Sequence, residues 1–117
     1  MTTTFLVAHS NPIVLIDVEG TLRDGFEGAT VRILNEASEI READLDGLTC
    51  LLIEGRAATP DLEPLLAAAE AARVPVAYVG HVPAGSDRGP VIRVPFTSAT
   101  LLRGVNSLIG SGSAPRP

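Results

Sequence analysis

The sequence predicts an α/β fold built on a five-stranded parallel sheet, and three observations support this fold class. Short apolar runs alternate with segments of helical spacing, as in successive strand–helix units. The run Thr49–Ile53 is apolar throughout, which is typical of a central strand covered on both faces. The length of 117 residues and the hydrophobic content of 45% suit one domain with a substantial core. We expect this domain over residues 1–110 and a flexible tail over 111–117.

The residue pattern in the first quarter of the sequence predicts a strand followed by a helix. Phe5–Ala8 is a short apolar run that suits a buried strand. Asn11 and Pro12 then match a helix start, with an N-cap residue followed by proline at the first helical position. Gly25 is expected to end this helix. The inward positions keep helical spacing and are Val14, Leu15, Val18 and Leu22.

The stretch between this helix and the central strand carries weaker signals. A second strand is expected within Gly28–Ile33. A weak helix is expected over Asn35–Ala43, with Ala37 and Ile40 facing the core.

Beyond the central strand the pattern predicts a helix, a strand and a short connection. Thr59 and Pro60 open the helix in the same cap-plus-proline style. Pro75–Val79 is the fourth expected strand. The segment His81–Pro90 contains two prolines and two glycines, so an ordinary helix is not expected there. The inner face of the helix is formed by Leu62, Leu65, Leu66 and Ala69.

The end of the chain predicts one more strand and one more helix. Val91–Val94 suits a fifth strand, and Thr97 or Ser98 caps the helix that follows. Gly110 is expected to end it. The apolar positions with helical spacing are Leu101, Leu102, Val105, Leu108 and Ile109.

Composition excludes several classes of function. The net charge is −5 and no basic stripe is present, which argues against a nucleic-acid surface. All nine basic residues are arginine, so the chain has no lysine. No apolar run approaches the roughly 20 residues that span a bilayer, and Met1–Phe5 does not begin a signal peptide, so we expect a cytoplasmic protein. The single cysteine, Cys50, suits a buried thiol and cannot form a multi-cysteine zinc site.

Landmarks in this order resemble the receiver domains of bacterial two-component systems, over roughly residues 4–109. Val7–Pro12 matches the end of the first receiver strand and the start of its helix, and Leu51–Arg56 matches the segment that carries the phosphoaccepting aspartate. Gly80 follows the fourth strand, and Val94–Phe96 matches a Lys-Pro-Phe signature in its last two residues. The resemblance implies a flavodoxin-like sheet of order 2-1-3-4-5. The short segment His81–Pro90 resembles a subgroup whose fourth helix is short or absent.

The same resemblance implies that the receiver's phosphoryl chemistry is lost. The acidic pair that binds Mg²⁺ is replaced, as are the acceptor aspartate, the hydroxyl that senses the phosphoryl group and the lysine that stabilises its charge. Mg²⁺ requires several oxygen ligands in near-octahedral geometry, so we expect neither Mg²⁺ nor another cofactor to bind. The positions of this degenerate pocket are, in chain order, His9, Ser10, Glu54, Gly80, Val94 and Pro95.

Two of these residues allow alternative interpretations. Glu54 is either a permanent mimic of the phosphorylated state or a solvated carboxylate paired with Arg56; the second is favoured because the lysine and hydroxyl that read such a mimic are absent. His9 is expected to be a polar strand end bonded to neighbouring backbone. The alternative is a metal site formed by His9, Glu54 and His81 at one edge of the sheet.

A rival interpretation comes from the segment Val14–Leu22, which resembles the first motif of haloacid-dehalogenase phosphatases. There Asp17 would be the nucleophile and Glu19 the acid/base residue. No late acidic pair for Mg²⁺ follows Val79, which counts against this interpretation. The two readings differ structurally, because Ile13–Leu22 is helical in a receiver and begins as a strand in the phosphatase.

The expected function is that of a non-enzymatic binding module in two-component or phosphorelay signalling. Its partner would be a histidine kinase, a response regulator or an identical copy in a homodimer, without nucleic acid or membrane. Receivers meet kinases mainly through their first helix, and the last helix offers Arg103 and Asn106 as surface candidates. A purely structural end piece of a hybrid kinase is the third alternative, although the initiating Met1 favours a standalone protein.

Overall fold

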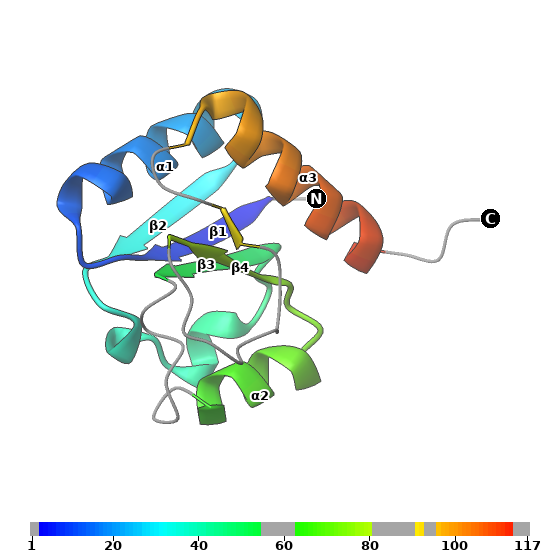
Figure 1. The fold of residues 1–117 in the computed structure, drawn as a ribbon. Helices are drawn as coiled ribbons and strands as arrows, with labels where there is room; N and C mark the ends of the chain where they lie inside the picture. The colour runs from blue at the N-terminus through cyan, green and yellow to red at the C-terminus, as the bar shows by residue number, and fades with distance from the viewer. Residues whose placement is uncertain (1–2, 55–62, 81–90, 93–95, 114–117) are drawn as a thin grey trace.

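The computed structural model describes residues 3–54, 63–80, 91–92 and 96–113. They form one parallel five-stranded sheet of order β2-β1-β3-β4-β5, shown in Figure 1. This order and the α/β class confirm the prediction. The strands are β1 Thr4–Ala8, β2 Thr30–Leu34, β3 Cys50–Glu54, β4 Val76–Val79 and β5 Val91–Ile92.

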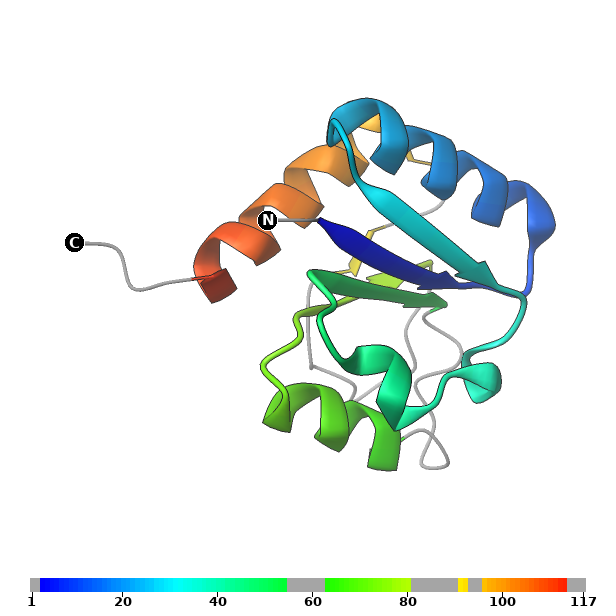
Figure 2. The same ribbon diagram turned by 180° about the vertical axis from the view of Figure 1, so that it is seen from behind.

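Helices cover both faces of the sheet. Helices α1 (Pro12–Gly25) and α3 (Ser98–Ser113) lie side by side on one face, as both views show (Figures 1 and 2). Helix α2 (Glu63–Ala71) covers the other face, together with the short 3₁₀ turns η1 (Ala37–Glu39) and η2 (Glu42–Leu45). None of the described helices is long and apolar enough to cross a membrane.

The sheet is buried on both sides because its inner strands are apolar on both faces. Phe5 and Val7 of β1 face the core beneath α1 and α3, whereas Leu6 and Ala8 face the core beneath α2. Cys50–Ile53 of β3 has no exposed surface, as the sequence predicts for the central strand. Each large side chain buried in this way contributes about 1.5–3 kcal/mol to folding. Other predicted inward residues are also buried: Val14, Leu15, Val18, Leu22, Ala37, Ile40, Leu66, Ala69, Leu101 and Val105.

Helix α1 begins and ends as the sequence predicts. The Asn11 side-chain Oδ1 accepts hydrogen bonds from the backbone N–H of Ile13 at 3.0 Å and of Val14 at 3.4 Å. Pro12 stands at the first helical position, where its missing N–H costs nothing. At the other end, a side chain at Gly25 would collide with Leu102 of α3, so this glycine also permits the close approach of the two helices.

The weak helix expected over Asn35–Ala43 is wrong, because η1 and η2 replace it. Each turn has the same cap. The backbone N–H of the residue just before the turn donates to the carboxylate of the residue three positions further along the chain. Glu39 does so for Glu36 at 3.0 Å, and Asp44 does so for Arg41 at 2.9 Å. A capping box of this kind marks the start of a helix. Because the second box begins only five residues after the first, the first helical turn cannot be extended. The segment therefore forms two single turns instead of one helix.

Helix α3 begins as predicted and ends later than predicted. Thr97 is the cap, since its Oγ1 accepts the backbone N–H of Thr100 at 3.1 Å. The helix passes through Gly110 and continues to Ser113, so the expected end at Gly110 is wrong. A glycine inside a helix costs only about 1 kcal/mol relative to alanine, which is too little to stop it by itself.

Several predictions about secondary structure concern residues outside the described part of the chain. They include the helix start at Thr59 and Pro60, the reduced fourth helix within 81–90 and the last residues of the fifth strand. Of the tail expected over 111–117, residues 111–113 are helical instead, and residues 114–117 are not described.

Candidate functional site

Three of the predicted site residues lie at the carboxyl ends of neighbouring strands. His9 directly follows β1, Glu54 ends β3, and Gly80 directly follows β4. Because these strands are adjacent and parallel, their ends meet at one edge of the sheet. In open α/β sheets this edge is where ligands bind, at the point where the strand order reverses.

The Glu54 carboxylate is tied to the end of β1. Its Oε1 accepts a hydrogen bond from the Ser10 hydroxyl at 2.8 Å, and its Oε2 accepts the Ser10 backbone N–H at 3.2 Å. Hydrogen bonds to an ionised acceptor are among the stronger ones in proteins. Both oxygens of Glu54 thus accept hydrogen bonds from a neutral residue, Ser10, which lies two positions beyond the end of β1. The alternative partner, Arg56, lies outside the described residues.

His9 is buried at the same edge and is bonded to backbone on two sides. Only 7% of its surface is exposed. Its Nδ1 accepts the backbone N–H of Asn11 at 3.0 Å, which requires an unprotonated Nδ1. Burial lowers the pKa of His9 below its ordinary value of 6.5, against the opposing effects of the Glu54 charge and a hydrogen bond to the Val79 backbone. The described contacts therefore favour the neutral imidazole.

Gly80 adopts a backbone conformation that other residues avoid. Its φ angle is +98°, in the left-handed region that favours glycine. Its N–H donates to the Ile92 carbonyl at 2.7 Å, which joins the end of β4 to β5. A threonine or serine at this position would be strained, because residues with a Cβ rarely adopt this φ angle.

Val94 and Pro95 lie outside the described residues, and so does His81. Within the described ranges, no three histidine, cysteine, aspartate or glutamate side chains come together as metal ligands.

The sequence analysis expected His9 to bond to neighbouring backbone but did not identify the two partners. It identified Asn11 as a helix cap, yet the N–H of the same residue is also the donor to His9. It identified Val79 as a strand residue and not as a hydrogen-bond partner of the imidazole. The spacing of His9 and Asn11 resembles that of turns in which an Asn or Asp side chain accepts the backbone N–H two residues on, but histidine is not a usual member of that class.

The phosphatase interpretation is wrong. Val14–Leu22, which it requires to begin as a strand, lies entirely within α1. Asp17 is exposed on this helix. Glu19 forms an ion pair with Arg23 one turn on, with 3.0 Å between Oε2 and Nη2. Neither carboxylate lies at the carboxyl end of a strand, where the phosphatase motif would place its nucleophile.

Helix α1 also carries an exposed apolar surface that sequence reasoning missed. Ile13 is 71% exposed and Ile16 is 63% exposed, whereas Val14 and Val18 of the same helix are buried. The signal was present, since neither isoleucine fits the helical spacing of the inward residues. On α3, the candidates Arg103 and Asn106 are exposed, as expected.

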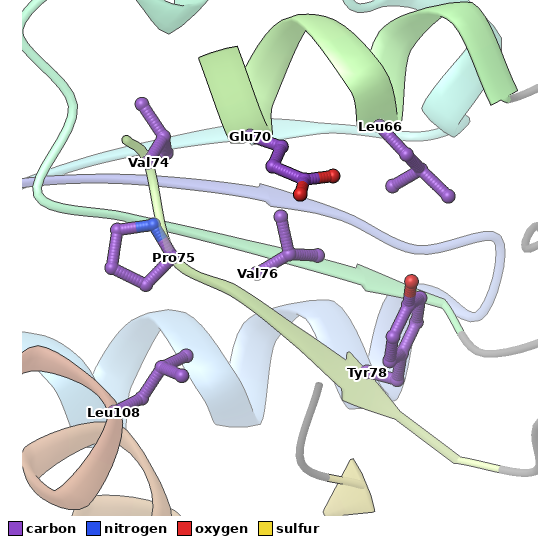
Figure 3. A pocket seen from close by; sticks show the side chains of 7 residues that line it. All are labelled: Leu66, Glu70, Val74, Pro75, Val76, Tyr78 and Leu108. Atoms are coloured by element: carbon purple, nitrogen blue, oxygen red, sulfur yellow. The ribbon is translucent and has the colours of Figure 1, made fainter. Parts of the chain in front are cut away.

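A separate pocket of about 400 Å³ lies beside β4. Figure 3 shows α2 residues on one side of it and Leu108 of α3 on the other, with the start of β4 between them. Glu54 lies level with Val79 at the far end of β4, so the pocket lies mostly toward the opposite edge of the sheet. Its lining residues are Leu66, Glu70, Val74, Pro75, Val76, Tyr78 and Leu108.

Comparison with known proteins finds similarity in structure. No protein-family model matches the chain, and no curated protein matches its sequence. A response regulator receiver protein from Sinorhizobium medicae WSM419 superposes with a TM-score of 0.75 at 23% identity, covering 96% of this chain and 98% of that one. A CheY-like receiver domain from Methanospirillum hungatei JF-1 gives 0.72 at 18% identity, covering 96% and 97%.

A third similar structure is the receiver domain of a sensor histidine kinase from Pseudomonas aeruginosa PAO1. Its TM-score is 0.71 at 19% identity, with 94% of this chain and 99% of that chain covered. That structure has a magnesium ion coordinated in its active-site cleft. These likenesses extend over almost the whole length of each chain, and the protein has the receiver fold.

Proposed function

We propose that this protein is a degenerate receiver-type signalling module that acts by binding other proteins and neither accepts a phosphoryl group nor catalyses a reaction. We place it in the cytoplasm, in a two-component or phosphorelay pathway, and assign it no nucleic-acid or membrane partner. The observation that carries the proposal is the set of contacts at the carboxyl edge of the sheet. There the Glu54 carboxylate is engaged by Ser10, and the adjacent His9 is buried and bonded to backbone.

The proposed loss of magnesium follows from the donor set. Receivers hold Mg²⁺ with an acidic pair and the acceptor aspartate, and magnesium prefers oxygen ligands including carboxylates. Here His9 and Ser10 hold the places of the pair, so Glu54 is the one carboxylate of that set. Both of its oxygens already accept hydrogen bonds. Among the described residues no ion pair joins Glu54 to a cation, and a single carboxylate without one is poorly suited to attack a phosphoryl donor.

The same contacts favour a structural role for Glu54 over mimicry of a phosphorylated residue. A mimic would act through the receiver's hydroxyl and lysine, and Gly80 and Val94 hold those places. The observed hydrogen bonds instead join the ends of β1 and β3. Glu54 in this proposal fixes the start of the segment that leads into α1.

Titration with Mg²⁺ and either acetyl phosphate or beryllofluoride tests the proposed loss of chemistry. We expect no saturable change in the NMR amide shifts of Ser10, Glu54 or Gly80, because the metal lacks its ligands. The matched control is the triple variant His9→Asp, Ser10→Asp and Glu54→Asp, which restores the carboxylates. We expect this variant to show magnesium-dependent shifts at the same amides. Saturable shifts in the unmodified chain would contradict the proposal.

The exposed face of α1 is the proposed docking surface for a histidine kinase. Receivers meet kinases through this helix, and here Ile13 and Ile16 present two large apolar side chains to solvent. Exposed apolar side chains that lie together are typical of interaction sites. Arg103 and Asn106 on α3 remain the proposed contacts for a response regulator or a second copy.

The double substitution Ile13→Ser and Ile16→Ser tests the docking surface. We expect the free energy of unfolding to change by no more than about 0.5 kcal/mol, because both side chains are exposed. We expect binding to a co-purified histidine kinase, measured by calorimetry, to weaken at least about tenfold, which corresponds to about 1.4 kcal/mol.

The control for this experiment is Ile33→Ser on β2, which removes an isoleucine that is 40% exposed and does not belong to α1. We expect it to leave the affinity unchanged. Equal weakening by both variants, or no weakening by the double substitution, would contradict docking through α1.

A further inference from the structure

We propose that His9 is a proton-operated latch on the start of α1. In its neutral form the imidazole holds the Asn11 backbone N–H. When it takes a proton from solvent, it releases this N–H and donates its own new N–H to the Glu54 carboxylate.

The neutral arrangement is fixed by hydrogen bonds around Asn11. The Asn11 N–H donates to His9 Nδ1 at 3.0 Å. The Asn11 side chain meanwhile accepts from Ile13 and Val14, and so caps α1. One residue therefore joins the imidazole to the first turn of the helix. A change in the charge of His9 acts directly on the residue that determines where α1 begins.

Protonation removes the acceptor on which this arrangement depends. A protonated imidazole carries hydrogen on both ring nitrogens and accepts no hydrogen bond. The Asn11 N–H would then point at the new N–H on His9 Nδ1. Because two donors repel each other, the imidazole or the Asn11 backbone must move. Among the described residues, the charged group facing His9 is the Glu54 carboxylate of β3; the contacts from β2 and β4 are the backbone of Leu34 and Val79.

Glu54 offers the new N–H an alternative partner. Its oxygens presently bind the backbone N–H and hydroxyl of Ser10, the residue between His9 and Asn11. An ion pair between His9 and Glu54 would bring a charged donor to a carboxylate that now binds only the neutral donors of Ser10 among the described contacts. The hydrogen bond from Asn11 to His9 and the proposed one from His9 to Glu54 exclude each other, because both use Nδ1, and one proton decides between them.

The direction of the pH effect follows from burial. Burial lowers the pKa of His9 in the folded chain below its ordinary value of 6.5, so the unfolded chain binds the proton more readily. The stability contributed by neutral His9 is complete above pH 6.5. It declines as the pH falls below 6.5 and stops declining below the pKa of the folded state.

The structural change that follows protonation of His9 reaches the exposed residue Ile13, because the Ile13 backbone N–H donates to the Asn11 side chain. Release of Asn11 loosens the first turn of α1 and displaces this side chain. The consequence for partner binding rests on the proposed docking through α1, but the latch does not. It is measurable in the isolated protein.

An NMR titration of the full chain from about pH 8 to about pH 4.5 tests the latch, since this range spans the ordinary titration of histidine. We expect the His9 ring protons and the amides of Asn11 and Ile13 to shift with one common midpoint below 6.5. Loss of its hydrogen bond should move the Asn11 amide proton upfield. Glu54→Gln should lower the common midpoint, because it removes the charge that favours protonated His9.

The matched control is His9→Asn, because an asparagine oxygen can accept the N–H two residues on and does not titrate in this range. We expect the Asn11 amide of this variant to be independent of pH, and His81→Gln to titrate like the unmodified chain. A transition at Asn11 that persists in His9→Asn would overturn the latch. So would different midpoints for His9 and Asn11, no titration of His9, or unfolding of the chain before His9 titrates. Because no partner is present, failure here is distinct from failure of docking.

Discussion

Replacement of Leu101 by alanine is expected to lower the free energy of unfolding by about 2–5 kcal/mol. Leu101 has no exposed surface and belongs to the core shared by β1, β3, β4 and α1. Its removal leaves a cavity between α3 and the sheet, and the neighbouring helix α1 cannot move inward without losing its own contacts. Urea denaturation followed by circular dichroism measures the loss. It is a large fraction of the total stability of a domain, which is commonly about 5–15 kcal/mol.

Two neighbours on α3 serve as controls for Leu101→Ala. Leu102 is half-buried and Arg103 is exposed. We expect Leu102→Ala to cost less than Leu101→Ala, and Arg103→Ala to change stability by no more than about 0.5 kcal/mol. An equal cost at all three positions would contradict the assignment of Leu101 to the inner face of α3.

Substitution of Gly80 by threonine is expected to lower the free energy of unfolding by about 1–3 kcal/mol. The φ angle of +98° is accessible to glycine, whereas a β-branched residue there is strained. In the proposed function, this position holds the place of the hydroxyl that senses the phosphoryl group in receivers. Gly80→Thr therefore tests whether a hydroxyl can be introduced here while the backbone keeps its positive φ angle. We expect thermal and urea denaturation both to report a less stable protein.

Gly20→Ala is the matched control for Gly80→Thr. Gly20 lies in α1, and a side chain there would meet no atom within 4 Å. Alanine favours the helix over glycine, so this substitution should raise the free energy of unfolding by about 0.5–1 kcal/mol. A neutral or stabilising effect of Gly80→Thr would show that the end of β4 accepts an ordinary residue.

Local patterns made most of the fold predictable. The cap at Asn11, the spacing of Val14 and Val18, and the apolar run into Ile53 each act over a few residues, and each appears in the structure as expected. The segment that follows β2 was predicted less well because two local preferences compete there. Its apolar spacing favours one helix, but Glu39 and Asp44 each cap a separate turn.

The site was predictable as a location but not as a set of contacts. Parallel strands bring His9 and Glu54 to one edge, and this required only the correct strand order. The pairing of Glu54 with Ser10 joins residues 44 positions apart and depends on side-chain conformations that spacing does not specify. The hydrogen bond from Asn11 to His9 depends further on which ring nitrogen carries the proton. The positive φ of Gly80 also depends on the path of the chain after β4, which composition does not reveal.

The division of the core by the sheet has a spectroscopic consequence. The chain has no tryptophan and a single tyrosine, Tyr78, which is 1% exposed in the core beneath α2. The core on the α1 and α3 side has the tilted pair Phe5 and Phe26, which absorb and emit weakly. The intrinsic tyrosine fluorescence therefore reports on the core between the sheet and α2, and hardly on the core beneath α1 and α3. We expect loosening of α1 to leave the fluorescence intensity nearly unchanged, whereas a disturbance of α2 should change it.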